Sequence, residues 1–108
     1  MSHWVGRVLV FLGLVFFTNS FAQNSLTGRV TDAEDQSTVI GASVYIPDLK
    51  RGAVTDVNGV YTIAGLPKGN FLVECKFIGY ATVVRSIQVS GVTELNIVLN
   101  SLVTELNE

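Results

Sequence analysis

The chain has 108 residues with seven Lys or Arg, nine Asp or Glu and a net charge of −2 at pH 7. This length holds one small hydrophobic core, and the weakly acidic balance excludes the basic patch that binds nucleic acid. The single cysteine excludes an intramolecular disulfide.

The first 22 residues have the order of a secretory signal peptide. A basic stretch ending at Arg7 precedes the apolar run 8–17, and the small residues Ser20 and Ala22 supply the cleavage pattern. The run has ten residues, whereas a helix needs about 20 to cross a bilayer. We therefore expect export with cleavage between Ala22 and Gln23. The expected organisation is a signal peptide over 1–22, one domain over 23–100 and a linker over 101–108.

Beyond residue 23 the pattern is that of β-strands. Val, Ile and Thr are frequent, and their branched β-carbons favour extended backbone. Short alternating runs are separated by Gly, Pro, Asn and Asp, which is typical of a sandwich or small barrel. Seven strands are predicted, over residues 26–30, 42–46, 53–55, 60–63, 70–77, 81–89 and 94–99.

Three of these strands predict which side chains meet the core. In the fifth, the odd-numbered residues from Phe71 to Phe77 face inward, so Cys75 is expected to be a buried thiol. In the last, the odd-numbered residues 95–99 face inward. In the sixth, Arg85 shares a face with apolar residues, which indicates a bulge or an edge strand where its guanidinium reaches solvent.

Turn residues separate the runs. The segment 56–59 predicts a tight hairpin between the third and fourth strands, because Asn and Gly tolerate positive φ. Pro67 and Gly69 form the next turn, and Gly79 with Tyr80 forms another. The residues expected to have structural roles in turns are Gly28, Gly41, Asp56, Asn58, Gly59, Pro67, Gly69, Gly79 and Tyr80.

Enzymatic chemistry is disfavoured by the residues that are missing. The only histidine, His3, lies in the signal peptide. The mature chain therefore lacks the base of Ser-His-Asp and Cys-His sites and the nitrogen ligands of most zinc sites. We expect no catalytic residue, no metal site and no cofactor.

Two sets of acidic residues are candidate sites. Asp32, Glu34 and Asp35 follow the first strand, and a glycosidase needs two carboxyl groups about 5 to 10 Å apart in a cleft. A solvated turn is the favoured interpretation, because the domain is too small to build such a cleft as well. Asp56 with Asn58 resembles the start of a calcium loop, but the remaining ligands are missing at the required spacing.

Sugar binding by aromatic platforms is the other possibility for an exported sandwich. The only tryptophan, Trp4, lies in the signal peptide. Tyr45, Tyr61 and Tyr80 remain, and each is expected to be half-buried with its hydroxyl at the rim.

The ordered motifs resemble one known family. They are Gly28-Arg29-Val30-Thr31-Asp32, Gly41-Ala42-Ser43-Val44, the run 52–61 containing Asp56-Val57-Asn58-Gly59, Leu66-Pro67-Lys68-Gly69, and Gly79-Tyr80. Together they resemble the carboxypeptidase-regulatory-like domain, from about residue 26 to 99. The resemblance implies an all-β, transthyretin-like (prealbumin-like) seven-stranded Greek-key sandwich without catalytic activity.

The family also implies a setting. Behind a signal peptide, this module commonly opens TonB-dependent outer-membrane receptors of the starch-utilisation type in Bacteroidetes, where it precedes a TonB box, a plug and a barrel. Residues 102–108 resemble the approach to that box. Two loops depart from the family pattern: 36–40 lacks a proline, and 47–51 lacks an extra glycine.

Two functions follow from this resemblance. The first is a periplasmic receptor domain, with the receptor plug and barrel as partners and periplasmic or envelope proteins as further ones. The alternative is a stand-alone exported binding module for glycans or an envelope protein. Neither involves nucleic acid.

Overall fold

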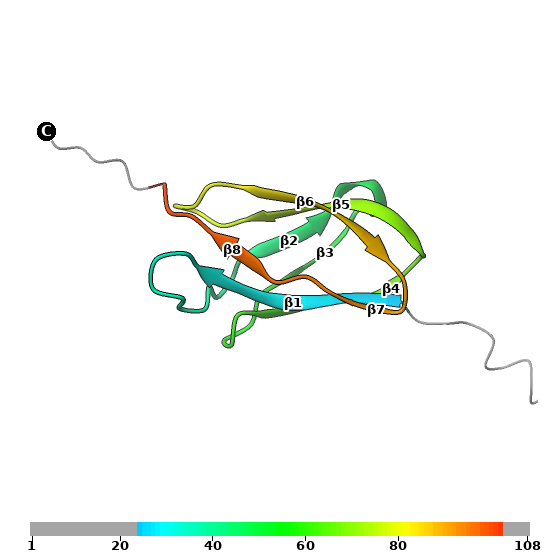
Figure 1. Ribbon diagram of the computed structural model, residues 1–108, viewed down its shortest axis with the longest axis horizontal. Helices are drawn as coiled ribbons and strands as arrows, with labels where there is room; N and C mark the ends of the chain where they lie inside the picture. Colours follow the sequence, from blue (N-terminus) through cyan, green and yellow to red (C-terminus); the bar gives the residue numbers. More distant parts are fainter. Residues whose placement is uncertain (1–23, 103–108) are drawn as a thin grey trace, which may run out of the picture.

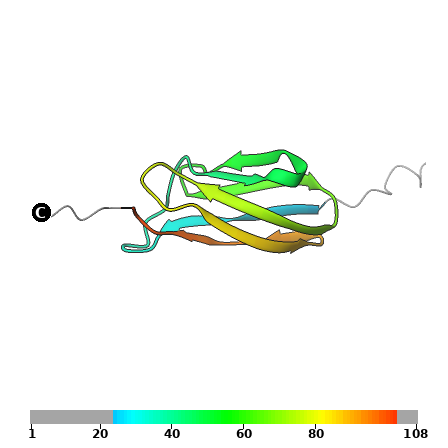
Figure 2. The same cartoon turned by 90° about the horizontal axis from the view of Figure 1, so that it is seen from above.

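The computed structural model describes residues 24–102, which form a sandwich of two β-sheets (Figures 1 and 2). One sheet has the order β4 (Val60–Leu66), β1 (Asn24–Asp32), β7 (Val92–Glu94), with β8 (Ile97–Leu99) also paired to β1. The other has the order β3 (Arg51–Val54), β2 (Ser43–Ile46), β5 (Gly69–Lys76), β6 (Val83–Val89). A short 3-10 helix, η2 (Pro47–Leu49), joins β2 to β3. The predicted all-β sandwich is confirmed.

β1 is the central strand of its sheet. It pairs antiparallel with β4, where Thr27 lies opposite Thr62, and parallel with both β7 and β8. In the second sheet, β5 pairs antiparallel with β2 and with β6. None of the helical segments within residues 24–102 has the length and apolar character needed to cross a membrane.

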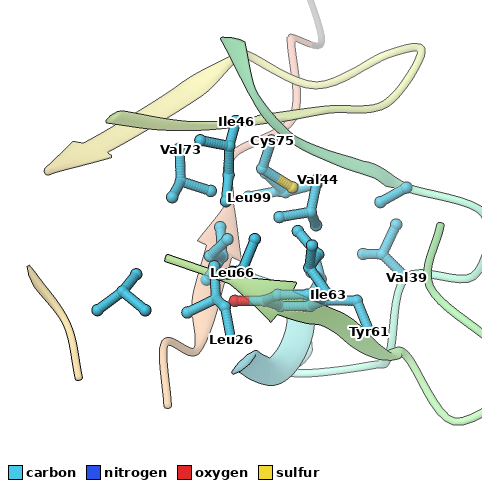
Figure 3. Packing of buried hydrophobic residues seen from close by; sticks show 14 residues of the cluster. Leu26, Val39, Val44, Ile46, Tyr61, Ile63, Leu66, Val73, Cys75 and Leu99 are labelled. Carbon is cyan, nitrogen blue, oxygen red and sulfur yellow. The ribbon is translucent and has the colours of Figure 1, made fainter. Parts of the chain in front are cut away.

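The core lies between the sheets and follows the period-two pattern of the sequence (Figure 3). Val73 and Cys75 of β5 are buried, with Phe71 and Phe77 packed partly buried against them, as predicted. Burying one such large apolar side chain stabilises the fold by about 1.5–3 kcal/mol. The other buried apolar residues are Leu26, Val30, Val39, Ala42, Val44, Ile46, Tyr61, Ile63, Leu66, Val89, Ile97 and Leu99.

The last predicted strand is two strands in the structure. β7 and β8 keep the same register on β1, since Thr27 pairs with Glu94 and Val30 with Ile97. The pairing is interrupted between them, which raises the strand count from the seven predicted to eight. Ile97 and Leu99 are buried as expected.

The strands at the sheet edges are protected against pairing with other chains. Arg51 donates from its guanidinium to the carbonyls of Ala64 (2.6 Å) and Gly65 (3.2 Å), which covers part of the free edge of β4. β6 is an edge strand and Arg85 on it is exposed, so the edge interpretation of that residue is confirmed. β7 and β8 have three residues each. Charges and short strands at edges disfavour edge-to-edge association.

Paired backbone continues past the expected domain end at residue 100. Tyr80 forms a β-bridge with Ser101, and the N–H of Leu102 donates to the carbonyl of Gly79 (2.8 Å). The domain therefore holds its chain to Leu102 at least. The expected cleavage site, Ala22 and Gln23, lies outside the described residues, as do His3 and Trp4.

Candidate functional site

A groove of about 470 Å³ lies on the outer face of the sheet that contains β1. Its floor and walls come from β1, β4, β7 and the segment between β7 and β8. The residues that line it are Thr27, Gly28, Arg29, Thr31, Val60, Glu94 and Asn96. Gly28, Arg29, Thr31 and Val60 belong to motifs of the family resemblance, but none of the lining residues was expected to bind a ligand.

The interruption between β7 and β8 shapes this groove. The Leu95 carbonyl accepts a hydrogen bond from the Tyr61 hydroxyl (2.5 Å), which reaches it from β4. The side-chain oxygen of Asn96 accepts instead from the Arg29 backbone N–H (2.9 Å). A side chain thus replaces one backbone acceptor in the β1 ladder.

Gly28 is required at this interruption. A Cβ at that position would lie 1.8 Å from the Leu95 carbonyl oxygen, closer than any non-bonded contact allows. The expectation that Gly28 is a turn residue is wrong: it lies in the middle of β1, where its missing side chain lets another backbone approach.

The groove offers both hydrogen-bond donors and acceptors. Asn96 donates to the Glu94 carboxylate at 3.3 Å, which leaves most of the acceptor capacity of Glu94 unused. Within the described part of the chain, the Arg29 guanidinium has no hydrogen bond or ion pair, and the one ion pair joins Lys76 to Glu74. The groove therefore presents a guanidinium that is unpaired within residues 24–102, and a carboxylate with acceptor capacity, to a molecule that enters it.

The Tyr61 hydroxyl supplies our first prediction. Tyr61→Phe removes the donor to the Leu95 carbonyl and keeps the ring, so we expect the free energy of unfolding to fall by about 1–3 kcal/mol. Urea denaturation measures the loss. Tyr45→Phe is the control, because Tyr45 is 39% exposed and its hydroxyl can bond to water. Equal losses in both variants would contradict the role assigned to Tyr61.

The acidic loop uses its carboxylates as turn acceptors. Asp32 accepts from the Glu34 N–H (2.7 Å), and Asp35 accepts from both the N–H (3.0 Å) and the hydroxyl (2.7 Å) of Ser37. The hydroxyl of Tyr80 donates to the second oxygen of Asp32 (2.6 Å). This bond and the Glu34 N–H hold the pKa of Asp32 below its usual range, and the same bond raises the pKa of Tyr80. Asp32 is thus ill suited to act as a proton donor.

This pair predicts a dependence of stability on pH. Because the pKa of Asp32 is lowered on folding, its contribution is fully present above the unfolded pKa of about 3.9 and is lost as the pH falls through the folded value. We expect Tyr80→Phe to lower the urea midpoint at pH 7 and to lose that effect at acidic pH. A midpoint difference that persists unchanged at pH 2 would show that the Tyr80 hydroxyl stabilises the fold by some contact other than its hydrogen bond to the ionised Asp32 carboxylate.

The turn at 56–59 crosses between the sheets. Asp56 accepts from the N–H groups of Asn58 and Val60, both at 2.9 Å, and its carbonyl accepts from Gly59 (2.8 Å). Gly59 has a φ of +74°. The expected hairpin is wrong, since β3 and β4 belong to different sheets and the turn carries the chain from one to the other.

The remaining turn residues lie at both ends of the sandwich. Pro67 stands between β4 and β5, at a second crossing between sheets. Positive φ angles occur at Gly41 (+88°), Gly69 (+150°) and Gly79 (+89°). In the segment that lacks the family's extra glycine, Lys50 takes the left-handed conformation with φ 51°, which no sequence pattern had indicated.

The tyrosines and the cysteine have distinct environments. Tyr61 is fully buried, which raises its pKa, and is not half-buried as expected. Tyr45 is exposed beside Gly52, whose Cβ would lie 3.0 Å from the ring. Cys75 is buried as predicted, and burial raises its thiol pKa to about 11. Within residues 24–102 there is no group of three metal-ligating side chains.

Comparison with known proteins identifies relatives of sequence and of fold. The chain is 26% identical over 101 residues to TonB-dependent receptor P3 of Formosa agariphila, which covers 94% of this chain and 10% of that receptor. A chain of a type II cohesin–X-dockerin complex from Acetivibrio cellulolyticus has a TM-score of 0.64 at 22% identity, over 71% of this chain and 57% of its own length. The minor pilin GBS52 of Streptococcus agalactiae has a TM-score of 0.61 at 14% identity, over 82% and 48% of the two chains.

The solved structures share the fold alone at these identities. The family model of the CarboxypepD_reg-like domain, by contrast, matches residues 26–108. That range contains every motif on which the sequence resemblance was based. The chain therefore belongs to the CarboxypepD_reg-like domain family.

Proposed function

We propose that this chain is the non-catalytic N-terminal domain of a TonB-dependent outer-membrane receptor for nutrient uptake. The observation that carries the proposal is the similarity to a receptor of that class along 94% of the chain. Because the chain spans only a tenth of that receptor, transport itself would belong to other parts of a longer polypeptide.

Export to the periplasm is part of the proposal. β1 begins at Asn24, two residues after the expected cleavage site at Ala22. Cleavage there would remove the apolar run 8–17 and leave every strand of the sandwich intact. The intact mass of the product recovered from the periplasm tests this step, and a mature chain that begins at Met1 would contradict it.

A non-catalytic role fits the use of the acidic side chains. Asp32, Asp35 and Asp56 each accept hydrogen bonds from backbone N–H groups of their own turns. These hydrogen bonds stabilise the turns. The pKa of Asp32 is also held below its usual range by the Tyr80 hydroxyl and the Glu34 N–H, whereas a general acid needs a raised pKa. We propose that the domain acts by contacts with neighbouring proteins.

The coding sequence beyond codon 108 is the sharpest test of the receptor proposal. We expect it to continue in frame into segments that encode a plug and a barrel. A stop codon followed by no such sequence in any frame would contradict the proposal. A second candidate function would then be favoured.

That candidate is a stand-alone exported module for glycans or an envelope protein, and the groove favours it. Arg29 and Glu94 offer a donor and an acceptor to the hydroxyls of a sugar. Calorimetric titration of residues 23–108 with oligosaccharides tests the idea, with Glu94→Gln as the variant and Glu74→Gln, on the other sheet, as the matched control. Binding lost only in Glu94→Gln would favour this function, and no binding by the parent would exclude it for the sugars used.

A further inference from the structure

One end of the sandwich carries large apolar side chains on its loops. These are Ile78 (88% exposed), Val57 (73%), Leu102 (59%) and Ile40 (53%). We call this the apolar end. It is the end at which β1 and β8 finish and from which the chain leaves after Leu102 (Figure 1).

Contacts at the apolar end bring three of its segments together. The backbone of Leu102 donates to Gly79, next to Ile78. A Cβ built on Gly41, next to Ile40, would lie 3.5 Å from the ring of Phe77. That ring in turn packs against Tyr80, with the ring centroids 6.0 Å apart. Ile40, Ile78 and Leu102 thus project from neighbouring loops around a partly buried aromatic pair.

The opposite end has loops of another character. Its turns contain Asp48 and Lys50, then Pro67 and Lys68, then Ser90 and Gly91, and the exposed apolar residue Val92 follows the last of them. Loop tips are usually polar, and grouped apolar residues on a surface mark an interaction site. Several exposed apolar side chains are therefore grouped at the apolar end, which makes it the better candidate for a contact surface.

The strand edges are poor alternatives for such a contact. Arg51 lies on the edge strand β3 and covers carbonyls of the edge strand β4, Arg85 lies on the edge strand β6, and the fourth edge is broken between β7 and β8. A partner that added a strand would meet a charge or an interruption on each of these edges. A partner that binds the apolar end does not need to add a strand, because it would contact the side chains of the loops there.

The charged residues around the apolar end indicate what kind of partner surface would bind there. Glu34 and Asp35 are exposed on the loop after β1, and Asp56 is exposed beside Val57. Lys76, at the end of β5, already forms an ion pair with Glu74. An anionic lipid surface would be repelled by these carboxylates, whereas a protein surface with apolar centre and basic rim would be attracted.

We propose that the apolar end docks on the next folded domain of the receptor chain, against an apolar surface flanked by Lys or Arg. This inference rests on the proposed receptor function. The chain leaves the sandwich at Leu102, within the apolar end. The domain that follows would therefore be tethered beside this surface at high effective concentration. At that effective concentration, even a small apolar interface would be formed most of the time.

Thiol labelling tests the docking. Ile78→Cys is compared with Val92→Cys, because Val92 is 75% exposed but lies at the start of β7, near the opposite end of the sandwich. The native Cys75 is buried with a raised pKa and should label slowly in either form. Maleimide labelling rates are measured in the 108-residue chain and in the detergent-solubilised full receptor.

We expect labelling at position 78 to be at least about tenfold slower in the full receptor, and labelling at position 92 to be unchanged. Equal rates at position 78 in the two forms would overturn the docking while leaving the receptor function standing. Slowing of position 78 in the isolated chain by phosphatidylglycerol vesicles, or by raised protein concentration alone, would also overturn it in favour of a membrane or a second copy. A gene that encodes no receptor would remove the proposed function, and the docking with it.

Discussion

Gly28→Ala should lower the free energy of unfolding by about 3 kcal/mol or more, enough to leave much of this small domain unfolded. The added methyl group would lie 1.8 Å from the oxygen and 2.6 Å from the carbon of the Leu95 carbonyl. Both are backbone atoms, so no side-chain rotation relieves the clash. The Tyr61 hydroxyl would lose its acceptor if Leu95 moved away. Urea denaturation followed by circular dichroism measures the loss.

Gly91→Ala is the matched control for this variant. Gly91 has a φ of +67° and no atom within 4 Å of a built Cβ, so the substitution adds backbone strain without a clash. That strain costs about 1–2 kcal/mol. If Gly91→Ala proves as harmful as Gly28→Ala, the close approach of Leu95 is not what requires glycine at position 28.

Gly59→Val should be comparably destabilising, by about 3 kcal/mol or more, for two reasons that add. The φ of +74° is strained for a β-branched residue, and a Cβ would lie 2.8 Å from Thr38 Cβ and 2.9 Å from the Val30 carbonyl oxygen. Asp56→Ala removes only the acceptor for two exposed N–H groups, which water can replace, and should cost about 1 kcal/mol.

Chemical denaturation of both variants, with and without calcium, separates two accounts of this turn. The greater loss in Gly59→Val and no effect of calcium are expected if Asp56 is a turn acceptor. If Asp56→Ala is the worse variant and calcium stabilises only the parent, the turn is a metal site.

The sandwich was predictable because one face of each long strand is buried. Alternation in β5 and β8 placed Val73, Cys75, Ile97 and Leu99 in the core, and the structure buries all four. Arg85 broke the alternation and thereby indicated either a bulge or an edge strand, and β6 is an edge strand. Alternating burial within a strand depends on the sequence of that strand alone, so it can be predicted without knowing which strands pair.

Strand pairing and the groove were not predictable from local patterns. Residues 56–59 are of the types that favour a hairpin turn, but the same turn can also carry the chain from one sheet to the other. The pairing of β4 with β1 shows that it does the latter. The interruption at Leu95 depends on Gly28 and Tyr61, which are distant in sequence. The groove residues Arg29, Glu94 and Asn96 come together only through that pairing.

Fractionation of the source cells with an antibody against this domain tests the central claim most directly. The receptor account predicts one band in the outer-membrane fraction, at a mass several times the 11.7 kDa of these 108 residues. A band below 11.7 kDa, found in the soluble periplasmic fraction and absent from the outer membrane, would contradict it.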